Sequence, residues 1–183
     1  MGSTEFERWL ADLFGKSTEQ MSQLLENPTA VQFLVTWSIF EYRCFEQSMK
    51  VGKIQPFVKC CIDNRFDEFS IVEYAKHFHQ RYKQNKRLYK HLLFDGKSAP
   101  LKLTCNQLPE IDSILKLTFE DLNTTQILTF SIFVAYRFRN NIFHGTKGVN
   151  SWLEFKEQID HCTNIMQRLI SHAEEISTQL KDV

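Results

Sequence analysis

The sequence is poor in the residues that interrupt regular structure. Its 183 residues include only six glycines and four prolines, against sixteen phenylalanines. Because glycine and proline mark turns and loops, their scarcity favours long regular elements and argues against a loop-rich or small-strand architecture. Hydrophobic residues form 43% and charged residues 24% of the chain, a composition that excludes wholesale disorder. The length suits one domain with a substantial core.

An excess of charge of one sign is also missing. The formal net charge is zero, so attraction to a polyanion has to come from a local patch. No apolar stretch is long enough to span a bilayer, and the N-terminus lacks the pattern of a signal peptide. The five cysteines are odd in number and form no Cys-x-x-Cys pair, which is typical of reduced thiols. We therefore expect a cytoplasmic protein without membrane contact.

The familiar motifs for nucleotides and metals do not occur either. Neither common glycine-rich phosphate loop is present. His77 and His79 are two residues apart, so a helix would direct them to opposite sides. With His91 and the vicinal cysteines they give no known zinc spacing. His161 is expected on the surface of the last helix, and the sequence predicts no metal and no other cofactor.

Capping residues and apolar periodicity predict helices over most of the chain. The expected helices are 4–14, 17–26, 29–49, 66–93, which is either continuous or broken near 84–85, 109–117, one that starts between 118 and 123 and ends near 140, and 151–181. Residues 56–64 are expected to connect two helices, and residues 95–106 to form a loop with a short extended piece at 101–104. The prediction is a single all-α domain over residues 1–183, a compact bundle of about five to seven helices.

Two of these helices are expected to supply much of the core. The helix ending near residue 140 contains ILTFSIFVAY, which is apolar on almost all sides and belongs at the centre of the fold. The last helix should bury one apolar stripe. The stripe consists of Trp152, Ile159, Cys162, Met166, Leu169, Ala173, Ile176 and Leu180.

Arg139 and His144 are close together where the central helix is expected to end. Residues five apart on a continuous helix point about 140° away from each other, so the chain has to turn for these side chains to converge. Asn140 and Asn141 tolerate turn conformations, and Gly145 adds freedom. Arginine and histidine are also common at helix C-termini without any function, because a positive charge favours the helix dipole.

The chemistry of this pair suits RNA cleavage without a metal. Arginine offers a rigid fork of donors that matches phosphate oxygens. Histidine can take and return a proton near neutral pH. In such a reaction His144 would activate the 2′-hydroxyl, while Arg139 would stabilise charge on the phosphorane-like transition state.

The segment RNNIFH, residues 139–144, has the pattern R-N-x-x-x-H and precedes the last long helix of a small all-helical chain. In both respects the chain resembles the HEPN superfamily. HEPN domains are bundles of two helical hairpins with an arginine, a polar residue after it, and a histidine four to six places downstream of the arginine. Gly145 is similar to the glycine that follows the histidine in some HEPN variants. One toxin branch has a tyrosine two places after the histidine, where this chain has Thr146.

The resemblance implies a metal-independent endoribonuclease, often a toxin of a toxin–antitoxin pair or an effector of phage defence. Family members typically form homodimers that bring two motifs into one cleft. By this resemblance Arg139 would bind and polarise the scissile phosphate, His144 would be general base or acid, and Asn140 would orient one of them. The implied partners are RNA, a second copy and an antitoxin or other protein. The alternative is a catalytically inactive HEPN-like module that binds RNA or protein.

A basic, aromatic-rich stretch and a polar triplet are further candidates. Residues 74–94 contain lysines, arginines and tyrosines but no acidic residue. Cations release counterions from an RNA backbone and exposed rings stack on bases, although a solvated face or an acidic protein partner would explain the same charge. The candidate RNA contacts are Lys83, Lys86, Arg87 and Lys90. The polar triplet Glu41, Tyr42 and Arg43 interrupts the apolar helix 29–49, and buried polar groups of this kind need partners. Glu41 and Tyr42, together with Asn141, are candidates for a second shell that would face the Arg139–His144 pair and help to position it.

Overall fold

The computed structural model describes residues 4–95, 99–100, 107–143 and 155–179, and within them the protein is all-α apart from one pair of two-residue strands. The helices are α1 (Glu5–Phe14), α2 (Thr18–Glu26), α3 (Thr29–Phe45), α4 (Ile54–Asp63), α5 (Val72–Gln84), α6 (Lys86–Leu93), α7 (Gln107–Lys116), α8 (Thr124–Phe143) and α10 (Lys156–Gln179). The 3-10 turns are η1 (Val51–Lys53), η2 (Glu68–Ser70) and η3 (Phe119–Asp121). Strands β1 (Phe94–Asp95) and β2 (Ala99–Pro100) pair antiparallel.

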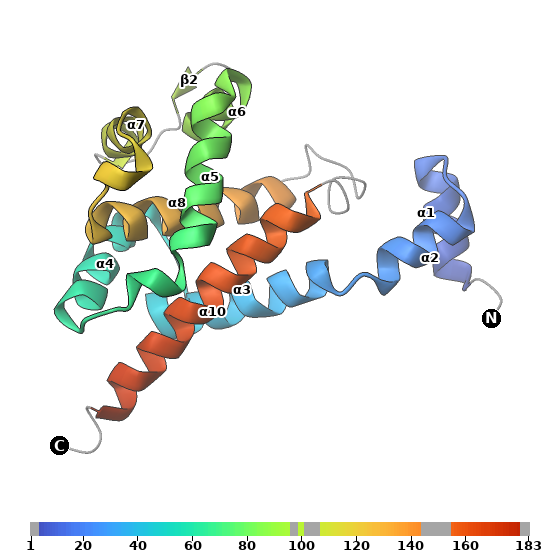
Figure 1. Ribbon diagram of the computed structural model, residues 1–183. Helices are drawn as coiled ribbons and strands as arrows, with labels where there is room; N and C mark the ends of the chain where they lie inside the picture. The colour runs from blue at the N-terminus through green and yellow to red at the C-terminus, as the bar shows by residue number, and fades with distance from the viewer. Residues whose placement is uncertain (1–3, 96–98, 101–106, 144–154, 180–183) are drawn as a thin grey trace.

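Helix α8 lies at the centre of the bundle, as its apolar sequence predicts. It packs against α4, α5, α7 and α10, and α10 packs in turn along α3 (Figure 1). Nine consecutive residues of α8, 127–135, are buried, including the hydroxyl-bearing Thr129 and Ser131. A helix with partners on every side has no solvent face, which explains why its sequence lacks amphipathic alternation.

Phenylalanine dominates the core. Six phenylalanine side chains are almost completely buried: Phe33, Phe40, Phe45, Phe78, Phe130 and Phe133. The rings of Phe40 and Phe45 meet edge to face with their centroids 5.1 Å apart, and Phe57 of α4 approaches Phe45 at 4.9 Å. Such edge contacts contribute about 0.5–1.5 kcal/mol each beyond the burial of area.

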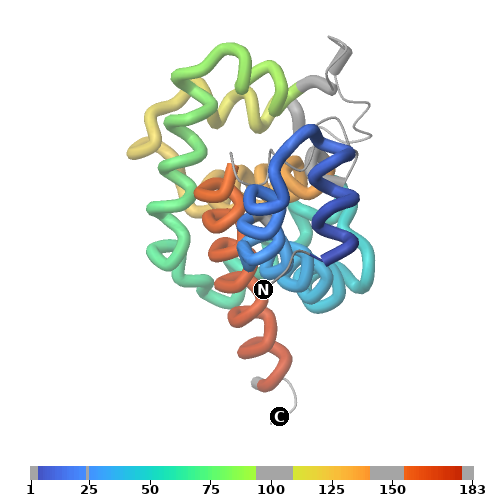
Figure 2. Tube along the Cα trace, turned by 90° about the vertical axis from the view of Figure 1, so that its right-hand side faces the viewer, coloured from blue at the N-terminus to red at the C-terminus, as the bar shows by residue number. Residues whose placement is uncertain are grey.

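Helices α1 and α2 form a hairpin with its own small apolar cluster, made of Leu10, Ala11 and Met21 with Phe14 packed against them. The hairpin lies beyond the N-terminal end of α3, at the right in Figure 1 and nearest the viewer in Figure 2. Its helices begin and end at the expected capping residues. Thr4 and Glu7 form a reciprocal capping box, Ser17 and Gln20 exchange hydrogen bonds in the same way, and Gly15 ends α1 with a left-handed φ of 61°. Both predicted helices are confirmed.

Helix α3 ends four residues earlier than predicted. Glu46 and Gln47 both have positive φ, 51° and 74°, which stops the helix at Phe45. The carboxylate of Glu41 then accepts a hydrogen bond from the backbone N–H of Met49 at 3.2 Å, and so holds the chain after the turn. Periodicity alone did not reveal this stop, because the apolar spacing continues to Met49.

The prediction of a connector at residues 56–64 is wrong, because α4 occupies this stretch. Pro56 lies in the first turn of α4, where a missing N–H costs no intrahelical bond. Ile54, Val58 and Cys61 are buried at helical spacing. The helical connector and the break at Asn85 raise the number of α-helices to nine in the described residues, instead of five to seven. Asn85 makes that break by accepting hydrogen bonds from the N–H groups of Arg87 and Leu88.

The later helices follow the prediction more closely. Asn123 and Gln126 cap the start of α8 reciprocally, and α8 runs to Phe143, beyond the expected end near 140. In α10, Ile159, Cys162, Met166 and Leu169 are buried as predicted, whereas Ala173 and Ile176 are half-buried. Trp152, Leu180, the capping Ser151 and the extended piece at 101–104 lie outside the described residues. None of the helices described combines the length and the hydropathy that a bilayer-spanning segment needs.

Candidate functional site

Arg139 lies in the C-terminal part of α8 and contacts α3. Its guanidinium carbon is 5.7 Å from the centroid of the Trp37 ring, and its Nη1 donates to Oδ1 of Asn140 at 3.2 Å. Trp37 is buried and both polar residues are half-buried. A cation over an indole face is favourable, and a positive charge near a helix C-terminus is favourable as well. The neighbouring helix and the next residue therefore restrict the orientation of Arg139.

The second member of the predicted pair, His144, lies outside the described residues. Helical backbone continues as far as Phe143, so the turn that would bring Arg139 and His144 together is not among residues 140–143. Asn141 lies in the last turn of α8. The convergence of these groups, and the role of Asn141, stay predictions.

The polar residues of α3 that were expected near this pair have other contacts. Glu41 accepts from the N–H of Met49, and Tyr42 is exposed with the guanidinium of Arg43 5.4 Å from its ring centroid. Arg43 forms an ion pair with Glu174 of α10 at 3.1 Å, and not with Glu41. A positioning role for Glu41 and Tyr42 stays a prediction.

The four predicted RNA contacts, Lys83, Lys86, Arg87 and Lys90, are all exposed on α5 and α6. Lys83 donates to the carbonyl of Leu117 at 2.5 Å and so caps the end of α7. Two of the three tyrosines in this stretch are less available than an RNA-stacking role needs. Tyr82 is buried and Tyr89 donates its hydroxyl to Asp112, so both rings serve the packing of the bundle.

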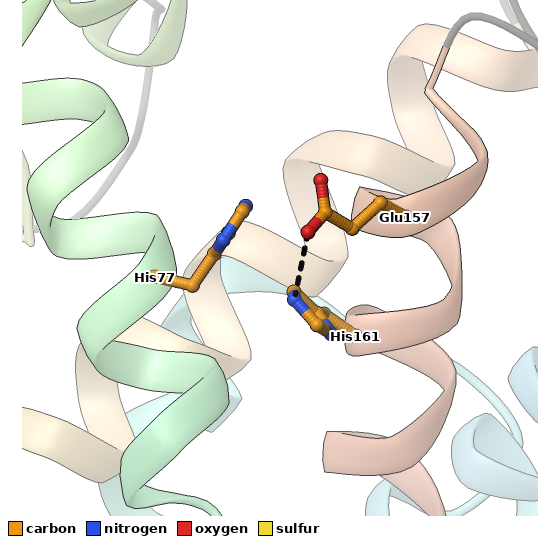
Figure 3. A group of neighbouring side chains, drawn as sticks. All are labelled: His77, Glu157 and His161. Atoms are coloured by element: carbon orange, nitrogen blue, oxygen red, sulfur yellow. Dashed lines mark ion pairs between the residues drawn. The ribbon is translucent and has the colours of Figure 1, made fainter.

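A different group of side chains, not expected from the sequence, comes together between α5 and α10. His77 of α5 faces Glu157 and His161 of α10 (Figure 3). Nε2 of His161 is 4.0 Å from a carboxylate oxygen of Glu157, and the two imidazole rings are 4.5 Å apart between centroids. The three possible ligand atoms all lie within 4.8 Å of one another.

The electrostatics of this cluster favour a neutral His77. Burial lowers the pKa of His77 first, and the neighbouring His161 lowers it further, while Glu157 acts in the opposite direction. Nε2 of His77 is buried and has no hydrogen-bond partner among the described residues. A neutral imidazole nitrogen without a donor keeps its lone pair available.

The sequence alone does not reveal the cluster, because its members are on separate helices. Glu157 and His161 are four residues apart and share one face of α10, which is a usable local signal. His77 joins them only through the packing of α5 on α10. His79, as expected, points to the opposite side, where its Nε2 meets the carbonyl of Ile114 at 3.2 Å.

Three of the four cysteines in the described residues are poor nucleophiles. The four are Cys44, Cys60, Cys61 and Cys162, and each is a free thiol. Burial raises the pKa of Cys61 to about 12 and raises those of Cys44 and Cys162 as well. A thiol with a raised pKa is not ionised near neutral pH and is a poor nucleophile.

Comparison with known proteins finds no matching family model, no matching curated protein and no matching solved structure. The function has to be inferred from the residues themselves.

Proposed function

We propose that this protein is a metal-independent endoribonuclease of the HEPN type that cleaves RNA through Arg139 and His144. The observation that supports this most is the restraint on Arg139. Its guanidinium lies over Trp37 and donates to Asn140, near the C-terminal end of the central helix. A side chain restricted in this way loses less entropy when it binds phosphate than a freely rotating surface arginine does.

In this proposal each residue of the motif has one task. Arg139 stabilises the charge that develops on the phosphate oxygens, and Asn140 fixes the direction of its donor fork. His144 takes the proton of the 2′-hydroxyl or returns one to the leaving oxygen. Arg139 and Asn140 lie in the last turns of α8, and His144 is the residue that follows this helix in the sequence.

RNA would reach this site along the exposed cations of α6. Lys86, Arg87 and Lys90 project from a short helix that has no acidic residue. Contacts of this kind release counterions and are independent of sequence, so they position the chain without selecting a target. A homodimer that brings two motifs together, and a role as toxin or phage-defence effector, belong to the same proposal.

The second candidate is a HEPN-like module that binds RNA without cutting it. The exposure of Lys86, Arg87 and Lys90 favours this candidate, because these cations are accessible to RNA whether or not Arg139 has a catalytic role. Here Arg139 would be a structural cation between α8 and α3. Binding would weaken steeply with salt, and no product would form.

The test compares wild type with His144→Ala and Arg139→Ala on total RNA in EDTA. The matched controls are Arg168→Ala and His91→Ala, which remove exposed side chains of the same types from α10 and α6. We expect wild type and both controls to leave 2′,3′-cyclic phosphate ends. We expect each motif variant to lose about 100-fold or more of the rate, with an unchanged circular dichroism spectrum.

Two results would contradict the ribonuclease. Equal cutting by His144→Ala and wild type would show that the activity arises elsewhere or from a contaminant. A mobility shift without product, lost in a Lys86→Ala/Arg87→Ala/Lys90→Ala variant, would instead support the binding module.

A further inference from the structure

The cluster of His77, Glu157 and His161 has the composition of a transition-metal site. Two imidazoles and one carboxylate form the same set of three ligands that zinc has in several hydrolases, with a fourth position left to water. Imidazole nitrogen favours Zn²⁺, Cu²⁺ or Ni²⁺, whereas Mg²⁺ and Ca²⁺ prefer a shell of oxygens. The donor types alone therefore favour an ion of the zinc class.

The distances are close to what such an ion requires. With bonds of about 2.0–2.1 Å, two ligands of a tetrahedral zinc are about 3.4 Å apart. Nε2 of His161 is 4.0 Å from a carboxylate oxygen of Glu157, and no two of the three ligand atoms are more than 4.8 Å apart. Small rotations of the side chains close this difference, and Glu157, whose side chain is 66% exposed, has room for them.

The surroundings leave the ligands available. Nε2 of His77 is buried without a hydrogen-bond partner among the described residues, a condition that costs free energy and that a metal bond would relieve. The positive charge of Arg81 acts on His77 and opposes the binding of a cation there. Its guanidinium, however, lies over the ring of Phe155, 5.7 Å from the centroid, and the carboxylate of Glu157 supplies negative charge beside the histidines.

We propose that His77, Glu157 and His161 bind one divalent transition-metal ion of the zinc class, which joins α5 to α10. Two ligands lie one turn apart on α10 and the third is on α5, so the ion bridges helices that are far apart in the sequence (Figure 3). Its effect is on the stability of the bundle. The proposal does not depend on the ribonuclease, because the chemistry proposed for RNA cleavage needs no metal and relies on different residues.

The test uses the full chain, stripped with EDTA and dialysed, and Zn²⁺ as the probe. We expect the wild-type Tm to rise by about 5–10 °C when free Zn²⁺ exceeds Kd by about a hundredfold. Co²⁺ should bind with a stoichiometry of one and give the visible absorption bands of a low-coordinate site. Glu157→Gln, which removes one exposed ligand without touching the core, should bind at least about tenfold more weakly, as should His77→Ala and His161→Ala.

The matched control is Glu175→Gln. Nδ1 of His172 is 4.0 Å from a carboxylate oxygen of Glu175 on the same helix, and among the described residues this histidine–carboxylate pair has no third possible ligand beside it. We expect the Zn²⁺ affinity and the Tm shift of the Glu175→Gln variant to equal those of wild type. Absence of a Tm shift and of Co²⁺ bands in wild type would overturn the proposal, and so would an equal loss of affinity in Glu157→Gln and Glu175→Gln.

Discussion

The N-terminal hairpin and the bundle hold together in different ways. The hairpin of α1 and α2 has a cluster of only a few apolar side chains, and it leaves more than half of Phe6, Trp9 and Leu13 exposed. The bundle from α3 to α10 buries one large continuous core. The helices of the hairpin depend mainly on capping boxes and a left-handed glycine, whereas those of the bundle, some of which are capped as well, also have long-range packing. Local signals can form helices, but only the bundle has enough buried area to be cooperative.

The largest effect should follow from a cavity in the bundle. Phe133 is fully buried at the centre of α8. Phe133→Ala removes its contacts with the elements around α8, and we expect the free energy of unfolding to fall by about 3–5 kcal/mol. Urea denaturation followed by circular dichroism measures this change.

Met21 offers the matched change in the hairpin, since it is equally buried but in the small cluster. We expect Met21→Ala to remove hydrogen-exchange protection from α1 and α2, while the main unfolding transition shifts by less than about 0.5 kcal/mol. If Met21→Ala shifted that transition as far as Phe133→Ala does, the two regions would unfold as one unit and the contrast would fail.

The same contrast explains which parts of the fold could be predicted. Thr4, Gly15 and Asn123 act within a few residues of themselves, so the ends that they cap could be predicted from the sequence. The end of α3 could not, because Glu46 adopts a positive φ that its residue type does not favour, and because Glu41 captures a backbone N–H eight residues later.

The candidate sites differ in the same respect. Arg139 and Asn140 can be proposed as site residues from the sequence, because they are adjacent parts of one contiguous motif. Trp37, which orients Arg139, lies on another helix, and no spacing in the sequence connects the two. The same holds for His77 and His161, which meet only when α5 packs on α10. Pairs of this kind depend on tertiary structure, and a single sequence contains no measure of it.

A smaller effect should follow from removing one cap in each region. Thr4 caps α1 and Asn123 caps α8, and each accepts a hydrogen bond from the N–H three residues later. Each change to alanine costs about 1 kcal/mol. We expect Asn123→Ala to lower the stability of the whole bundle by that amount in urea, and Thr4→Ala to affect only the exchange of amides in α1. Global destabilisation by Thr4→Ala would show that the hairpin is coupled to the bundle.

The smallest effect is expected from a change of pH, and it too should separate the regions. Burial lowers the pKa of His77 and of His79 below the ordinary value near 6.5. As the pH falls, these histidines therefore bind protons at a higher pH in the unfolded chain than in the folded one. The bundle loses stability below about pH 6.5 for this reason. In the hairpin, hydrogen bonds lower the pKa values of Glu7 and Glu19, so the stability that these carboxylates add is lost only as the pH falls below about 4.5.

Urea denaturation at pH 7.5 and pH 5.5 tests this difference. We expect the transition of the bundle to move to lower urea at pH 5.5, while amide exchange in the hairpin, corrected for its intrinsic pH dependence, gives unchanged protection. His79→Gln is the matched variant, because its amide can still donate to the carbonyl of Ile114 but does not titrate. The bundle of this variant should respond less to acid than that of wild type. An equal response would mean that His79 is not one of the groups that bind protons on unfolding.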